Sequence, residues 1–190
     1  MIWLLIIVIV VLLAVVGVLA LRQRRSAQLR EGFGPEYDRV VRDRGNQSEA
    51  EAELRERRDR RSGYDIRPLG ATSRDRYAER WRKTQAQFVD QPASALADAD
   101  TLVAEVMHER GYPVDDFEQQ AADVSVDHPE VVSHYREAHA IHVRNAKQRA
   151  STEDLRQAMV HYRALFTELL EPPSHEEDET TRSARIEEVR

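Results

Sequence analysis

Hydrophobic and polar residues divide the chain into three stretches with different patterns. Residues 2–21 carry no polar side chain, whereas residues 48–61 are almost all charged or alanine. From residue 73 to residue 170, apolar residues recur every three or four positions between residues that favour helix ends. This spacing is typical of amphipathic α-helices, and no segment alternates as a strand does. The sequence therefore predicts an all-α protein containing a small bundle of about five helices.

The N-terminal apolar run has the length of a membrane-spanning helix. Its twenty residues would form a helix about 30 Å long, which matches the hydrocarbon core of a bilayer. A cleaved signal peptide fits less well, because nothing basic precedes the run and the run is longer than a signal-peptide core. We therefore predict a transmembrane helix over residues 1–21, anchored by Ile2, Trp3 and Leu21 among others.

A group of arginines follows this run, formed by Arg22, Arg24, Arg25 and Arg30. Basic residues next to a span stay on the cytoplasmic side and contact anionic headgroups. The expected location is therefore the bacterial plasma membrane, crossed once, with the N-terminus outside and the C-terminal domain in the cytoplasm.

Residues 22–61 are expected to form a basic juxtamembrane segment and a charged helical stalk. Gly34 interrupts the first helix, and Pro35 suits the first turn of the next one. Leu54 is the only large apolar residue from 48 to 61, so this part has no apolar face to bury and is predicted to be solvated. Residues 62–72 contain Gly, Pro and Ser, which predicts a linker.

The helical bundle is expected over residues 73–170. Pro92, Asp115 and Ser151 are predicted to lie at the starts of its helices. The predicted core consists of aromatic and apolar residues at helical spacing: Tyr77, Trp81, Phe88, Leu102, Phe117, Tyr135, Met159, Tyr162 and Phe166. The polar tail, residues 171–190, is predicted to be disordered.

The string "VDHPEV" predicts a helix start within the bundle. Asp127 can be the N-cap, Pro129 falls in the first turn, and Glu130 can reach back to the N-cap amide. Val126 and Val131 then occupy the two positions of a hydrophobic staple. We therefore expect Asp127 and Glu130 to cap a helix that runs towards Lys147.

Charge and composition exclude several functions. The net charge is -6 and cysteine is absent, which disfavours nucleic-acid binding and removes disulfides, thiol nucleophiles and cysteine zinc sites. Residues 91–133 hold ten acids and one arginine, so this segment is expected to display an acidic surface. No glycine-rich phosphate loop or nucleophile elbow is present. We therefore predict no catalytic, cofactor-binding or metal-binding residue and no small-molecule substrate.

Histidines between residues 123 and 142 are the strongest candidates for chemistry. His139 and His142 have the i, i+3 spacing of helical metal ligands, and His134 lies one residue off that spacing. A carboxylate ligand would have to come from another segment, such as Asp123 or Asp127. A partly buried helix face explains the same histidines without a metal.

Several strings resemble a family of uncharacterised single-pass bacterial membrane proteins with a cytoplasmic helical domain. They include "FGPEYDR", "YDIRPL", "FVDQP" and "STEDLRQAMVHYRALF", and the resemblance spans residue 33 to about residue 170. It implies an anchored helical domain and no particular activity.

These patterns predict a membrane-anchored, non-enzymatic helical module that binds another protein at the cytoplasmic face of the lipid bilayer. Its acidic segment would attract basic partners. The alternative is a metal-dependent or hydrolytic enzyme that uses His134, His139 and Asp127. A third reading places the domain outside the cell.

Overall fold

The computed structural model describes residues 2–114, 116–147 and 149–171, and in these ranges every regular element is an α-helix. The predicted all-α fold is therefore confirmed. The helices are α1 (Ile2–Arg44), α2 (Gln47–Ser62), α3 (Ala71–Gln87), α4 (Pro92–Arg110), α5 (Phe117–Asp127), α6 (Val132–Ala146) and α7 (Thr152–Leu170). The predicted disorder of residues 172–190 lies outside the described residues.

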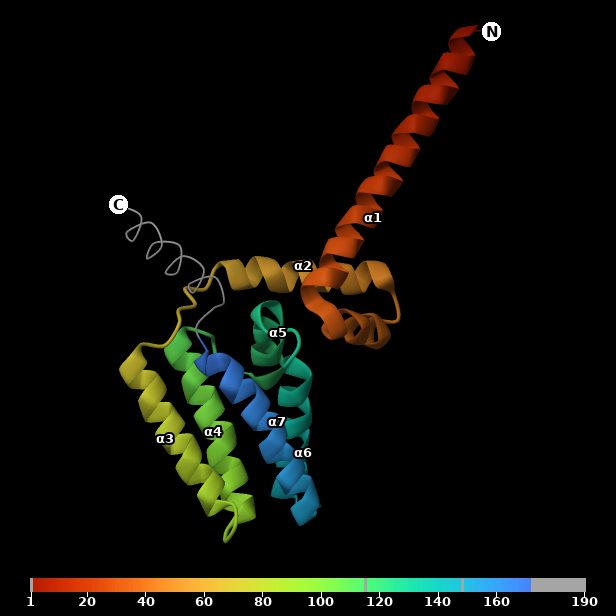
Figure 1. Ribbon diagram of the computed structural model, residues 1–190. Helices are drawn as coiled ribbons and strands as arrows, with labels where there is room; N and C mark the ends of the chain where they lie inside the picture. Colours follow the sequence, from red (N-terminus) through yellow and green to blue (C-terminus); the bar gives the residue numbers. More distant parts are fainter. Residues whose placement is uncertain (1, 115, 148, 172–190) are drawn as a thin grey trace, which may run out of the picture.

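Four helices form the body of the molecule. Helix α7 packs against both α4 and α6, and α3 covers the outer side of α4. Helix α2 lies across one end of this body, with α5 between the two, and the first part of α1 projects away from it (Figure 1). The molecule is therefore a helical bundle with a helical hairpin, made by α1 and α2, on one end.

The bundle core is aromatic and tightly packed. Trp81 of α3 stacks on Phe166 of α7, with ring centroids 4.6 Å apart. Phe88 and Phe117 are partly buried and pack against the core. The other residues expected in the core are buried there: Tyr77, Trp81, Leu102, Tyr135, Met159, Tyr162 and Phe166. Each such side chain stabilises the fold by about 1.5 to 3 kcal/mol through burial.

Local sequence signals fix several helix ends. Pro92 is at the first position of α4, and Ser151 and Asp154 form a complete capping box at the start of α7. Gly111 ends α4 in the left-handed conformation, with φ of 100°. The third bundle helix is capped by Asp116, whereas the expected cap at Asp115 lies outside the described residues.

The expected helix cap at Asp127 is wrong. Helix α5 continues to Asp127, and α6 begins only at Val132, with no side-chain cap at Val131. The Asp127 carboxylate instead accepts hydrogen bonds from Arg61 Nε and Tyr112 Oη, each at 2.5 Å. Glu130 is exposed in the connecting turn. These tertiary partners outweigh the local capping pattern, because Arg61 brings a full positive charge and Tyr112 a second donor to the same carboxylate oxygen.

The expected solvated stalk is also wrong. Helix α1 kinks at Gly34, which has φ of 46°, and its last part folds against α2. Leu54 and Ala50 are fully buried there, against an apolar surface of α1 formed by Leu29, Phe33, Tyr37 and Val40. One leucine is enough to give α2 a buried face, because α1 supplies the other large apolar side chains of this cluster. The boundaries expected between the stalk, linker and bundle stay predictions.

The expected membrane span is contradicted as well. In the part of the chain that the structure describes, no helix is both long and apolar enough to cross a bilayer. Residues 2–21 lie in α1, and many of their side chains, including that of Ile2, lie outside the described residues. This finding overturns the predicted single-pass location in the bacterial plasma membrane.

Gly45 and Gly111 both have positive φ, but only Gly111 is closely packed. Comparing their alanine variants therefore distinguishes the cost of backbone strain from the cost of a steric clash. A Cβ at Gly111 would lie 2.5 Å from the backbone oxygen of Asp65, whereas a Cβ at Gly45, with φ of 67°, would meet nothing within 4 Å. We expect Gly45→Ala to cost about 1 kcal/mol in unfolding free energy, the usual penalty for a left-handed residue. Gly111→Ala should cost at least about 2 kcal/mol, since backbone must also move. Urea unfolding would measure both, and equal costs would contradict the steric argument.

The buried position of Leu54 gives a second prediction. Leu54→Ala should lower the unfolding free energy by about 2 to 5 kcal/mol, because it leaves a cavity between α1 and α2. Arg55→Ala, at the exposed neighbouring position, is the control and should change it by less than about 0.5 kcal/mol. Urea unfolding together with hydrogen exchange of the α2 amides would show the loss. A change at Leu54 as small as the control would restore the solvated stalk.

Candidate functional site

The fold keeps His139 and His142 together, with ring centroids 6.0 Å apart, but it separates the other candidate residues. His128 contacts Glu168 of α7 at 3.2 Å, and His134 contacts His161 of α7 at 2.8 Å. His139 faces Asp100 of α4 at 3.5 Å and stacks on Phe117. Asp127 is bound by Arg61 and Tyr112 instead. The predicted combination of His134, His139 and Asp127 is therefore not assembled.

The residues expected to anchor the chain are exposed where their side chains are described. Trp3 and Leu21 are exposed on α1, as are Arg22, Arg24 and Arg25. Arg30 is also exposed; it pairs with Asp38 at 3.1 Å and lies over the ring of Tyr37. No two of these residues share a described hydrogen bond or ion pair.

Five of the ten acids in the acidic segment, residues 91–133, pair with arginines from other helices. The pairs that connect it to α2, α3 and α6 are Asp123 with Arg60, Asp127 with Arg61, Glu105 with Arg80, Glu109 with Arg76, and Glu118 with Arg136. The segment therefore carries less uncompensated negative charge than the sequence suggests, because the fold brings arginines from distant parts of the chain next to its acids.

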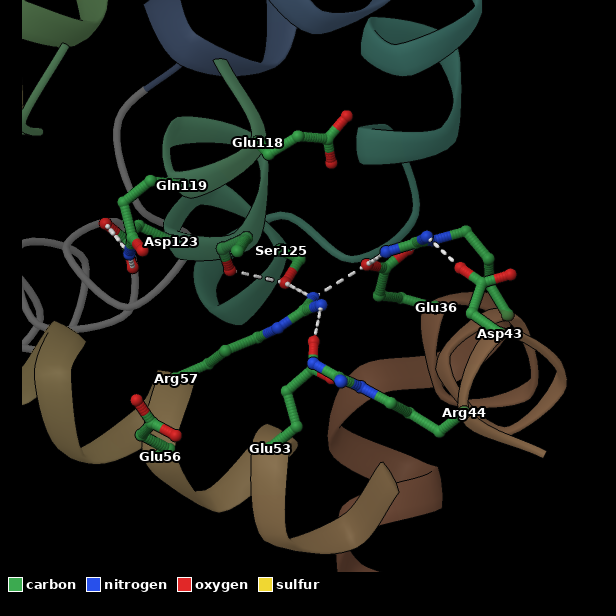
Figure 2. Close-up of polar contacts among 12 residues, drawn as sticks. Glu36, Asp43, Arg44, Glu53, Glu56, Arg57, Glu118, Gln119, Asp123 and Ser125 are labelled. Carbon is green, nitrogen blue, oxygen red and sulfur yellow. Dashed lines mark hydrogen bonds and ion pairs between the residues drawn. The ribbon is translucent and has the colours of Figure 1, made fainter. Parts of the chain in front are cut away.

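The most unusual group of side chains is a buried network where the hairpin meets the bundle (Figure 2). Glu36 of α1 is 2% exposed, and its carboxylate accepts hydrogen bonds from Arg39 of α1 at 2.6 Å and Arg57 of α2 at 2.8 Å. Arg136 of α6 lies 3.3 Å from the same oxygen. Arg57 also donates to Ser125 Oγ of α5, at 3.2 Å. One carboxylate thus connects three helices, and Arg57 extends the network to α5 as a fourth.

This arrangement keeps Glu36 ionised despite its burial. Burial alone would raise the pKa of Glu36, but the hydrogen bond from Arg39, the charge of Arg136 and the hydrogen bond from Arg57 together hold that pKa below its ordinary value. A buried carboxylate is tolerable only with such partners, because an unpaired charge in the interior costs several kcal/mol. Glu53 is similar: burial would raise its pKa, and hydrogen bonds from Arg57 and Arg44 lower it.

Asp123 forms a second buried contact between the hairpin and the bundle. Its side chain is fully buried on α5, and it accepts hydrogen bonds from Arg60 Nε of α2 at 3.0 Å and from Gln119 Nε2 at 2.9 Å. Together with Glu36, it ties α2 to the bundle through ion pairs rather than through apolar contact alone.

A cleft of about 360 Å³ opens between α2 and the first turns of α5, next to this network. Its arginines, Arg57 and Arg60, are already bound to internal carboxylates. Glu56 of α2 and Glu118 of α5 expose 75% of their side chains at its edge, where Glu56 pairs with Arg60 at 3.3 Å and Glu118 with Arg136 at 2.8 Å. Its lining is mostly charged, so it suits a polar or cationic group better than an apolar ligand.

The residues of this site were missed in the sequence because they come from four distant segments. One signal was available: Asp123 and Ser125 interrupt the otherwise apolar run of residues 121–126. A polar residue on the buried face of a helix has a partner elsewhere in the fold. The sequence contains no indication of which partner that is.

Comparison with known proteins identifies no relative of this chain. The chain matches no protein-family model, no curated protein and no solved structure. The resemblance drawn from the sequence strings therefore stays a prediction, and function has to be argued from the geometry.

The ionised state of Glu36 makes the docking of the hairpin sensitive to acid. Because its folded pKa is lowered from 4.5, its contribution to stability is present above the unfolded pKa and is lost as the pH falls through the folded value. Glu36→Gln should lower the unfolding free energy by about 1.5 to 3 kcal/mol at neutral pH, because it removes the buried charge that three arginines share. Each arginine keeps one further carboxylate partner: Asp43, Glu53 or Glu118. The difference between the variant and the wild type should shrink below pH 4.5.

Urea unfolding at a series of pH values measures this difference directly. Exposed Glu31 on α1 provides the control, because Glu31→Gln keeps the same change in net charge outside the network. A Glu36→Gln penalty that stays constant from neutral to acid pH would show that the carboxylate charge is not what stabilises the hairpin.

Proposed function

We propose that this protein is a non-enzymatic helical module that binds a basic segment of another protein at the cleft between α2 and α5. The observation that carries the proposal is the charge arrangement of the cleft. Arg57 and Arg60 are held by internal carboxylates. Glu56 and Glu118 each expose 75% of their side chains at the edge, where one oxygen of Glu56 accepts from Arg60 and one oxygen of Glu118 accepts from Arg136. The second oxygen of each carboxylate could accept from an arginine or lysine of a partner.

The size and lining of the cleft favour a protein partner over a substrate. A volume of about 360 Å³ is at the small end of ligand sites, and such sites are usually apolar. A single long basic side chain would fit the space, and neighbouring carboxylates raise the rate of encounter with cationic partners. Rigid packing of α2 on α5 would present the two carboxylates at a fixed separation.

The enzymatic alternative has less support. Its proposed carboxylate, Asp127, is engaged by Arg61 and Tyr112, and its two histidines, His134 and His139, face different helices. General acid and base groups must lie within hydrogen-bond reach of one reacting atom.

Binding of a fluorescent hexa-arginine peptide to the full chain tests the proposal. The double variant Glu56→Gln/Glu118→Gln should weaken binding about tenfold, which corresponds to roughly 1.4 kcal/mol for the two lost ion pairs. The matched control is Asp75→Asn/Glu153→Gln, which removes two exposed acids of α3 and α7 and should leave the affinity nearly unchanged. Fluorescence anisotropy at constant ionic strength is the measurement.

An equal loss of affinity in both double variants would show that only overall charge attracts the peptide. That result would remove the cleft from the proposal. Circular dichroism of each variant verifies that the helices are intact, since exposed ion pairs contribute little to stability.

A further inference from the structure

A cluster of metal-ligating side chains lies between α6 and α7, apart from the cleft. His134 and Glu137 are one turn apart on α6, and His161 projects from α7. One ligand atom from each of the three lies within 4.8 Å of the others. The sequence spacing within α6 pointed to His139 and His142, so this set is visible only once α7 is packed against α6.

The two imidazoles meet nitrogen to nitrogen, in a contact that a proton or a metal ion can bridge. Nδ1 of His134 lies 2.8 Å from Nδ1 of His161. Two neutral rings tolerate this contact only if one nitrogen carries a proton that the other accepts. A metal ion can replace that proton after a small movement, because tetrahedral ligand atoms about 2.0 to 2.1 Å from zinc lie about 3.3 to 3.4 Å apart. The two rings would therefore separate by about 0.5 Å on binding.

The carboxylate of Glu137 completes the set. Its Oε2 atom is 3.0 Å from Nε2 of His161, where it can ligate the ion or hold the imidazole ring in the orientation that ligation needs. Glu137 exposes 62% of its side chain and His161 only 11%. An ion could therefore enter past the glutamate and reach the inner histidine without unfolding the bundle.

We propose that His134, Glu137 and His161 form a binding site for a divalent transition metal of the zinc class. Two imidazoles and a carboxylate are typical zinc ligands and leave an open coordination position for water or for a group of a partner. The site joins α6 to α7, so metal binding would also crosslink the two helices that share the most extensive contact in the bundle. This inference goes beyond the proposed function and does not depend on it.

Calorimetric titration of the chelator-treated full chain with zinc chloride tests the site. We expect saturable binding and a rise in melting temperature, since an ion that binds only the folded state stabilises it. His134→Ala and Glu137→Gln should each weaken binding about tenfold or more. Both side chains are partly or largely exposed, and Glu137→Gln preserves shape, so these variants are expected to fold. Magnesium should not compete, because it prefers oxygen ligands.

Two matched variants locate the ion. His108→Ala removes an exposed histidine of α4, and His142→Ala removes the histidine of α6 that lies near His139; neither should change the affinity for zinc. Binding that is insensitive to His134→Ala and Glu137→Gln would overturn the proposal. Loss of binding in His142→Ala would also overturn it, by placing the ion near Asp100 and His139 instead.

Discussion

The carboxylate of Glu36 is the interaction on which the arrangement of this molecule depends. Arginines of α1, α2 and α6 all converge on it, and Arg57 extends the network to Ser125 of α5. Removing this carboxylate would take away the one acceptor that the three arginines share and would leave each with a single carboxylate partner. The hairpin and the bundle are consequently held in one orientation, because a buried ion pair tolerates little change in geometry. Apolar contact alone would allow α2 to slide.

The same network reaches the edge of the cleft. Arg60 pairs with buried Asp123 and with exposed Glu56. Arg136 lies near buried Glu36 and pairs with exposed Glu118. The histidine cluster lies elsewhere, on the α6–α7 pair. The proposed partner-binding and metal-binding sites therefore occupy separate parts of the molecule, and a change at one need not alter the other.

Much of the helical architecture could be predicted from local chemistry. Pro92, Ser151 with Asp154, and Gly111 mark helix ends because capping and backbone strain act over only a few residues. The capping pattern at Asp127 misled for the same reason. Its side chain has stronger partners in Arg61 and Tyr112, and α5 therefore continues to the residue where α6 was expected to begin. A local pattern is decisive only when no tertiary partner competes.

The sequence by itself determined that the protein is helical, where most of the bundle helices lie and which aromatic residues could form a core, because these depend on periodicity and short-range preference. Only the tertiary structure decided that Leu54 is buried, that Glu36 and Arg57 pair, and that His134 meets His161 rather than His139. The hairpin pair lies 21 residues apart and the histidine pair 27 apart in the chain. No helical period relates such residues, and packing alone determines which of the many possible charge and histidine partners are brought within contact.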